Sequence, residues 1–455
     1  MIGIKKIRRG VGVLALGAGL AFLGGCDAVD KLLVVSNPSQ LQESSVNDAA
    51  LIPILVNSIE GAMVDLYDYN IVWLGSMFTD EQMTGVNWEQ TARLNERIVK
   101  FDEGDADAQF SQIHDLRAMA DSVAGRFKGG LLENASSDWR TAFAQAYAGY
   151  AYIFLGDMMC ETTINVGETI YPSEQMYQFA VERFTDAISI AGAAGDADIQ
   201  NLARAGLARA HLNMGNYADV VSVGAQVPPG FEWWLQYAPI GDEAPQNNMY
   251  SNVSGQNHRI GVHPHFLAGG PDKFLENDLE PFLTDPRVQH YPYWRTGHNA
   301  LSPLYTPYQG IRYSGYNGQT IATGGQPAEF LADDDILIAD YLSVRHDMWE
   351  AINAQGSDAA GVLAFVNERR AFGNQDPVDL SGTALTMELR DQRGRDLFLA
   401  GFRMGDLRRW LRGGTDMFPS GPHPTEEWGV YENATCYPMP VEEYEGNPNI
   451  AKPGG

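Results

Sequence analysis

The sequence has little cysteine and little positive charge, and it lacks a long apolar run after its N-terminus. Only 3 cysteines occur in 455 residues, too few for a disulfide framework or a cysteine-rich zinc site. Lys and Arg number 31 against 58 Asp and Glu, an excess of acid that argues against a nucleic-acid-binding protein. The absence of a further run of 18 apolar residues excludes a protein with several membrane-spanning helices.

Residues 1–25 have the pattern of an export signal. A basic start precedes an apolar stretch from Val11 to Leu23, which is too short to span a bilayer, since a spanning helix needs about 20 residues. The stretch ends in Gly24-Gly25-Cys26, which resembles a bacterial lipobox, where the cysteine is acylated and becomes the first mature residue. The alternative is an ordinary signal peptide with a chance cysteine. An acylated Cys26 predicts a lipid-anchored and otherwise soluble protein.

Removal of the signal makes the net charge of the chain more negative. It takes away four basic and no acidic residues, which leaves 27 Lys and Arg against 58 Asp and Glu, a charge of −31. The mature chain keeps Cys160 and Cys436. These two cysteines either form a disulfide in an oxidising compartment or remain a buried pair of thiols.

Apolar residues recur at helical spacing through much of the chain. They predict helices over 47–69, 107–127, 144–155, 173–191, 202–214, 335–354, 360–370 and 383–401. Helices 144–155 and 202–214 alternate small with larger residues and are followed by Gly-Asp or Gly-Asn, with an inserted loop expected over 157–172. This pattern resembles the first helix and turn of a tetratricopeptide repeat, in which small side chains permit close antiparallel packing. Unrelated amphipathic hairpins are the alternative.

We therefore expect a mostly α-helical protein with a tetratricopeptide-like scaffold and a large irregular insertion. The mature chain, residues 26–455, is expected to form one domain. The helical scaffold covers about 40–225 and 331–412, the loop-rich insertion about 226–330, and an irregular C-terminal segment 413–455. Proline and glycine break every run in the insertion, which predicts loops with short helices or strands.

The strongest chemical signal is the stretch from Tyr291 to Ala328. It holds six tyrosines and a tryptophan, its only charges are two arginines, and it contains no acid. Aromatic faces stack on the C–H faces of sugar rings, while amides and arginine bind hydroxyl groups. The predicted stacking residues are Trp88, Tyr293, Trp294, Tyr305 and Tyr308. The alternative is that the tyrosines only fasten a long loop onto the helices.

Catalytic and metal-binding patterns are weak. His263-Pro264-His265 lacks a carboxylate or a third ligand at helical spacing for zinc. Asp333-Asp334-Asp335 is expected to cap the following helix rather than to bind calcium. No nucleophile elbow, phosphate loop or dinucleotide fingerprint occurs. Two carboxylates placed in space would suffice for a glycosidase, but we expect no enzyme, no cofactor and no metal.

Residues 389–410 carry a family resemblance. They read LRDQRGRDLFLAGFRMGDLRRW, which is similar to the SusD/RagB family's arginine-rich helix followed by Glu-Gly-x-Arg and Asp-Leu-x-Arg-Trp. The matching residues are Arg403, Asp406, Leu407, Arg409 and Trp410. Ala400 stands where the family has glutamate. One-turn spacing predicts that Asp406 pairs with Arg409 or Arg403.

Further motifs resemble the same family in the expected order. Asp285-Pro286-Arg287 and Tyr308-Gln309-Gly310 lie in the insertion, and Pro438-Met439-Pro440, Glu442 and Asn447-Pro448-Asn449 close the chain. With the lipobox and the repeat helices, the resemblance covers nearly all of the mature chain.

The resemblance implies a lipoprotein on the outer leaflet of the outer membrane that caps a SusC-like TonB-dependent transporter. Such a protein captures an oligosaccharide, or a peptide in the RagB branch, and delivers it without catalysis. The family has no fixed ligand motif, so the stacking residues rest on composition alone. The alternative is a tetratricopeptide-like scaffold lipoprotein that holds other envelope proteins in a groove among its helices. Asp27 directly after Cys26 signals inner-membrane retention in some sorting systems. The inner membrane is therefore an alternative location for the lipid anchor.

Overall fold

The structure is a computed structural model of the chain. It describes residues 48–85, 89–102, 104–239, 246–253, 260–267, 285–293, 304–317, 328–424 and 429–451. Residues 49–455 form one compact unit. The predicted lipidation site Cys26 and the predicted stacking residues Trp88 and Trp294 lie outside the described residues, as do the side chains of Tyr293 and Tyr305.

The unit begins with a continuous helical stretch of 30 residues. It consists of η1 (Ala49–Leu51), α2 (Ile52–Leu66), the π-helix η2 (Tyr67–Leu74) and α3 (Gly75–Phe78). By length and composition alone this stretch qualifies to cross a membrane. From Leu66 to Phe78, however, every residue except Tyr69 is buried within the protein. The stretch therefore serves as a core helix of the folded unit.

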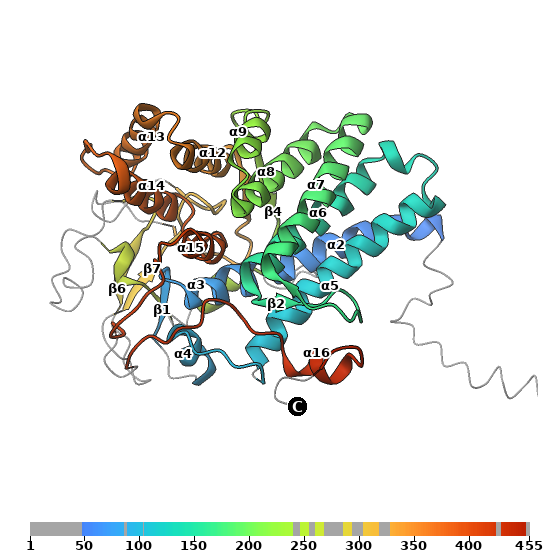
Figure 1. Ribbon diagram of the computed structural model, residues 1–455, viewed down its shortest axis with the longest axis horizontal. Helices are drawn as coiled ribbons and strands as arrows, with labels where there is room; N and C mark the ends of the chain where they lie inside the picture. The colour runs from blue at the N-terminus through green and yellow to red at the C-terminus, as the bar shows by residue number, and fades with distance from the viewer. Residues whose placement is uncertain are drawn as a thin grey trace, which may run out of the picture. The chain divides into compact units, whose positions relative to one another are not determined.

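The helices that follow pack side by side as antiparallel pairs, as Figure 1 shows, and this confirms the tetratricopeptide-like scaffold. They are α5 (Gly104–Arg126), α6 (Trp139–Met158), α7 (Ser173–Ala194), α8 (Ala197–Met214) and α9 (Tyr217–Gly224). Phe184 of α7 lies between two glycines, where an added Cβ would approach its ring to 2.6 Å at Gly149 and 2.2 Å at Gly206. Small residues thus permit the close helix contact that the repeat pattern predicts.

One predicted helix end is wrong. Gly215 ends α8 in the left-handed conformation, as expected, but Gly156 lies inside α6, which continues to Met158. A Cβ at Gly156 would lie 2.5 Å from the ring of Tyr177, so this glycine serves helix packing rather than capping. Asp157 is consequently a buried helical residue, and the predicted loop holds the short hairpin β2 (Glu161–Thr162) and β3 (Tyr171–Pro172).

The second helical region contains α12 (Tyr341–Gln355), α13 (Ala359–Phe372), α14 (Gly382–Asp396) and α15 (Arg403–Arg412). Its first predicted helix starts six residues late, because Ile336–Asp340 is strand β8, paired with β4 (Glu232–Leu235). Asp340 caps α12 through a capping box with Ser343. The predicted cap at 333–335 is therefore wrong: Asp334 accepts hydrogen bonds from Gln309 and from the amide of Leu331.

The insertion at 226–330 contains short elements, as predicted. They are β4, α10 (Asn248–Asn252), β5 (Ile260–Val262), η5 (Pro264–Phe266), β6 (His290–Tyr293) and β7 (Leu304–Pro307). Two further short elements belong to the N-terminal half, β1 (Gln82–Thr84) and α4 (Glu89–Asn95). Within the described residues, the strands form two-stranded sheets rather than one large sheet.

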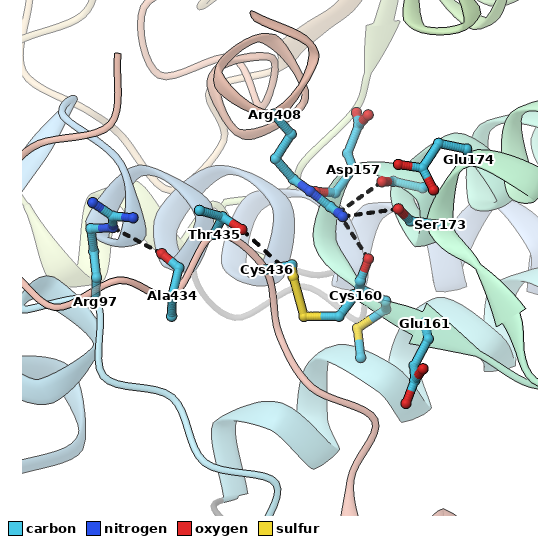
Figure 2. The surroundings of a disulfide bond; sticks show 12 residues. Arg97, Asp157, Cys160, Glu161, Ser173, Glu174, Arg408, Ala434, Thr435 and Cys436 are labelled. Atoms are coloured by element: carbon cyan, nitrogen blue, oxygen red, sulfur yellow. Dashed lines mark hydrogen bonds between the residues drawn. A yellow bond between two sulfur atoms is a disulfide. The ribbon is translucent and has the colours of Figure 1, made fainter. Parts of the chain in front are cut away.

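The C-terminal segment, with its short helix α16 (Val441–Gly446), is fastened to the end of α6 by a disulfide. Cys160 and Cys436 are separated by 276 residues in sequence, and their Cα atoms lie 5.1 Å apart. The amide of Cys160 also donates to the carbonyl of Tyr437 at 2.8 Å. Figure 2 shows Arg408 beside this disulfide, where it donates to the Ser173 hydroxyl at 2.9 Å. Of the two alternatives for the cysteines, the structure has the disulfide.

Helices α14 and α15 place a row of arginines in the protein interior. Asp406 contacts Arg409 at 2.9 Å, which confirms one predicted pair, and it also accepts from Arg393 at 2.7 Å. Arg403 instead makes a two-pronged contact with Asp80, with both distances 2.6 Å. At Ala400, the backbone carbonyl accepts a hydrogen bond from the Tyr67 hydroxyl at 2.7 Å. The motif at 389–410 therefore stabilises the core through buried ion pairs and hydrogen bonds.

Candidate functional site

The elements that carry the predicted stacking residues lie together, although the sequence separates them by about 200 residues. Strand β1 pairs with β5, strand β6 pairs with β7, and β5 lies against β7. Figure 1 shows β1 and α4 on the same side of the unit as β6 and β7. Trp88 belongs to the segment that joins β1 to α4, Trp294 follows β6, and Tyr308 follows β7. We call this group of elements the strand cluster.

The hairpin of β6 and β7 gives two predicted residues a defined backbone register. Tyr293 stands opposite Leu304 and Tyr305 opposite Pro292, so the two tyrosines are not cross-strand partners. Tyr308 is half-buried, and its amide donates to the carbonyl of Gln289 at 2.8 Å. The backbone of Tyr308 therefore fastens the end of β7, and part of its side chain stays accessible, while its stacking on a ligand stays a prediction.

Asn95 makes hydrogen bonds to residues that precede Trp88 in the chain. The amide of Thr84, before this segment, donates to Asn95 Oδ1 at 3.0 Å. Asn95 Nδ2 donates to the carbonyls of Met77 at 2.8 Å and Gln82 at 3.1 Å. His423 of the C-terminal segment lies 3.1 Å from the same Oδ1. One buried amide thus joins α3, β1, α4 and the C-terminal segment, and it fixes both ends of the Trp88 segment.

The motif Asp285-Pro286-Arg287 anchors the hairpin to helix α14. Arg287 contacts Asp285 through two nitrogens at 2.8 and 2.7 Å and reaches Asp396 at 3.2 Å. A Cβ at Gly310 would lie 2.5 Å from the carbonyl oxygen of Arg287. The motif at 308–310 therefore needs glycine because the backbone of β7's end passes directly over the arginine. Arg287 and Gly310 therefore have structural roles.

Glu81 lies beneath the strand cluster as a buried acid. Its Oε1 accepts from the amide of Leu399 at 2.8 Å, and Leu399 has a left-handed φ of 53°. The Tyr313 hydroxyl donates to the carbonyl of the same residue at 2.7 Å. These two bonds hold a strained backbone in place. Burial raises the pKa of Glu81 to about 8, against the lowering effects of the Leu399 amide and Arg403.

Replacing Glu81 with glutamine is expected to stabilise the protein at pH 8. The folded-state pKa of Glu81 is raised, so wild-type stability falls as the pH rises from about 4.5 towards about 8. Glutamine keeps the acceptor for Leu399 and carries no charge, so the variant is expected to gain roughly 4 kcal/mol at pH 8 and nothing at pH 4. Urea unfolding at both pH values measures this. Glu60→Gln, on an exposed face of α2, is the control, and an E81Q gain that does not depend on pH would contradict the assignment.

Of the two histidines at 263 and 265, His263 has a ring that is fully hydrogen-bonded within the protein. His263 Nδ1 accepts from the amide of His265 at 3.1 Å, which leaves Nε2 to donate to the Tyr431 hydroxyl at 2.9 Å. Burial lowers the pKa of His263 to about 3, so the ring is neutral at pH 7. Both ring nitrogens are therefore used. Within the described part of the chain, no group of three or more His, Cys, Asp or Glu side chains is arranged to hold a metal ion.

A separate hollow of about 550 Å³ lies in the helical scaffold. Its lining residues are Ala62, Asp65, Tyr69, Gln112, Asp115, Met119 and Asn248. Beneath it, Asp68 accepts from the amide of Asn248 at 2.6 Å, and burial raises the pKa of Asp68 to about 7. None of the predicted stacking residues lines this hollow. It is a groove among helices of the kind that the scaffold alternative requires.

No family model and no curated protein matches the chain. Solved structures do match it. A SusD-like protein from Bacteroides fragilis aligns with a TM-score of 0.65 at 14% identity, over 91% of this chain and 99% of that chain. A SusD superfamily protein from Parabacteroides distasonis gives 0.60 at 14% identity, over 91% and 100%. A SusD-like carbohydrate binding protein from Bacteroides vulgatus gives 0.63 at 11% identity, over 90% and 99%. The chain therefore has the SusD-like fold, as the motifs at 389–410 and elsewhere predicted.

Proposed function

We propose that this protein captures an oligosaccharide at the strand cluster and passes it on without chemical change. The observation that carries the proposal is the proximity of strand β1, which precedes Trp88 in the chain, to the β6–β7 hairpin through β5 on a SusD-like fold. Aromatic residues from distant parts of the chain can then form one stacking surface for sugar rings. A structural neighbour described as a carbohydrate binding protein supports the same ligand class.

The proposal includes a place in the cell and a partner. We propose that Cys26 carries the lipid anchor, that the protein lies on the outer membrane, and that a SusC-like TonB-dependent transporter receives the ligand. The disulfide between Cys160 and Cys436 supports an oxidising compartment outside the cytoplasm. Recovery of a large β-barrel protein with the tagged lipoprotein would support the transporter. Protease treatment of intact cells tests surface exposure, and full protection would contradict it.

The ligand-binding test uses two tryptophans of the strand cluster. Trp88→Ala combined with Trp294→Ala is expected to weaken oligosaccharide binding at least tenfold, because two stacking contacts of about 1 kcal/mol each are lost. Isothermal titration against the best ligand from an oligosaccharide panel measures this. Trp139→Ala is the matched control, since Trp139 is exposed at the start of α6. Unchanged affinity in the double variant would reject the site, and binding of peptides alone would reject the ligand class.

The second candidate function is a scaffold lipoprotein that holds envelope proteins, and the scaffold hollow at Tyr69 favours it. This function predicts that Asp65→Ala with Asp115→Ala abolishes the recovery of partner proteins, while the tryptophan double variant retains it. Glycan affinity combined with a co-purified β-barrel would instead support capture and transport.

A further inference from the structure

A second hollow among the helices has a different chemistry from the scaffold hollow at Tyr69. It has a volume of about 200 Å³, well beyond the roughly 30 Å³ that one water occupies. Helices α9, α12, α14 and α15 supply its walls, through Tyr217, Glu350, Asn353, Ala354, Thr386, Leu389, Arg390, Arg409, Trp410 and Gly413. We call it the Arg390 pocket. A larger hollow of about 400 Å³ adjoins it and shares Tyr217, Arg409 and Gly413.

Arg390 stands apart from the other inward-facing arginines of the described chain. Carboxylates lie against Arg209, Arg287, Arg369, Arg393, Arg403 and Arg409. Backbone carbonyls accept from Arg97 and Arg408. Arg390 has neither: its contacts are two methionine sulfurs, Met387 and Met417, each at 4.0 Å. Its Nε is buried without a hydrogen-bond partner in the described structure.

The surroundings of Arg390 keep its guanidinium in place without neutralising it. The group lies over the indole of Trp410 at 5.1 Å from the ring centroid, a favourable cation–π distance. Glu350, the acid in the lining, is already bound by Arg409 through both oxygens at 3.0 and 2.8 Å and by Trp410 Nε1 at 2.7 Å. Burial is the main cause that lowers the pKa of Arg390. Glu350 and Asp406 attract the guanidinium of Arg390 at longer range, but within the described structure no carboxylate contacts it directly.

A neutral donor completes the pocket. The Tyr217 hydroxyl lies in the lining. The Thr386 hydroxyl is used within the protein, because it accepts from the Asn353 amide at 2.9 Å and donates to the carbonyl of Gly382 at 3.2 Å. A carboxylate is the anion that a guanidinium fork and a hydroxyl donor accommodate. The negative charges of Glu350 here and Glu174 in the adjoining hollow disfavour a multiply charged anion.

We propose that the Arg390 pocket binds a small organic monocarboxylate, with the guanidinium of Arg390 contacting the carboxylate and Trp410 lying under the guanidinium. The site is distinct from the strand cluster, and the proposal does not depend on oligosaccharide capture.

The test compares D-glucuronate with D-glucose, which differ by a carboxylate, in titrations of the full mature chain at pH 7. Wild type is expected to bind glucuronate at least tenfold more tightly than glucose. Arg390→Gln is expected to weaken glucuronate binding at least tenfold, because a charge-assisted hydrogen bond is lost. Arg390→Lys keeps the charge without the fork and is expected to fall between the two. Tyr217→Phe removes one hydroxyl and is expected to weaken binding severalfold.

Controls separate this site from other causes. Lys128→Gln removes one positive charge from a surface pair with Asp186 and is expected to bind glucuronate like wild type. The Trp88 and Trp294 double variant is also expected to retain glucuronate binding, even if it loses oligosaccharides. Equal wild-type affinity for glucuronate and glucose would overturn the proposal. So would an Arg390→Gln variant with an unchanged melting temperature and unchanged glucuronate affinity.

Discussion

Replacing Asp396 with asparagine is expected to lower the free energy of unfolding by about 3–5 kcal/mol at pH 7. Asp396 is fully buried and accepts from Arg369 through two bonds of 2.8 Å, from Arg287 at 3.2 Å and from His346 at 2.7 Å. Burial keeps His346 neutral by lowering its pKa, so the two arginines are the charges that Asp396 neutralises. Asparagine has nearly the same shape, and its loss of charge leaves two buried guanidiniums without that partner.

The effect of Asp396→Asn depends on pH in a defined direction. The surrounding donors and arginines hold the pKa of Asp396 well below its usual range, despite burial. The stabilisation is therefore present above the unfolded-state pKa near 4 and declines as the pH falls below it. Urea unfolding at pH 7 and pH 3 measures the shrinking gap. Asp376→Asn, at an exposed position, is expected to change stability by less than about 0.5 kcal/mol. A similar loss in both variants would contradict the role of Asp396.

Loss of the disulfide is expected to cost about 4 kcal/mol, because the bond closes a loop across 276 residues of sequence. The expected result is a lower urea midpoint for Cys160→Ala with Cys436→Ala, measured in mature chains that carry Cys26→Ser. The native contacts around the bond, such as Tyr437 to Met158 at 2.8 Å, remain available. The variant is therefore expected to fold at 25 °C, but with a lower free energy of unfolding.

Reductant provides the internal control for the disulfide. Dithiothreitol is expected to lower the midpoint of the two-cysteine chain to that of the double-alanine variant and to leave the variant unchanged. Two free thiols in the untreated folded chain would contradict the bond. An unchanged midpoint after complete reduction would contradict its energetic role.

Local patterns predicted most of the helices because apolar spacing and capping glycines act over a few residues. The limits of this reasoning appear at β8. Residues 336–339 of β8 are a continuous apolar run, and all residues of the strand are buried. Such a run is compatible with a strand or a helix until its partner β4 is known. Gly156 shows a second limit, since glycine before a polar residue is typical of a helix end and also of a close helix contact.

Most partners of the buried charges could not be predicted from the sequence. The exception is the pair of Asp406 and Arg409, which a spacing of one helical turn predicted. The pairing of Asp80 with Arg403 spans 323 residues, and no local rule selects that partner among 58 acids. Glu81 and Asn95 were missed for the same reason, because their importance lies in carbonyls and amides that only the folded chain brings near.

For the candidate site, the composition of the sequence indicated the aromatic stretch at 291–328, and the structure shows that strands β6 and β7 of this region pair with each other. Sequence alone had no means to bring β1, which precedes Trp88 in the chain, near the β6–β7 hairpin about 200 residues away, because this proximity arises from the pairing of β1 with β5 and the contact of β5 with β7. The choice among the five stacking residues stays a prediction, which the tryptophan double variant tests.

The burial of Phe78 between two rings of the C-terminal segment has a consequence for the order of events during synthesis. Its ring lies 5.2 Å from Tyr437 and 6.5 Å from Phe418, so a core residue near the start of the unit lacks both of these ring contacts until residue 437 has been made. A growing chain therefore exposes apolar surface and does not close its core on the ribosome. For a chain exported by the signal predicted at residues 1–25, late completion of the core around Phe78 would allow translocation to precede folding.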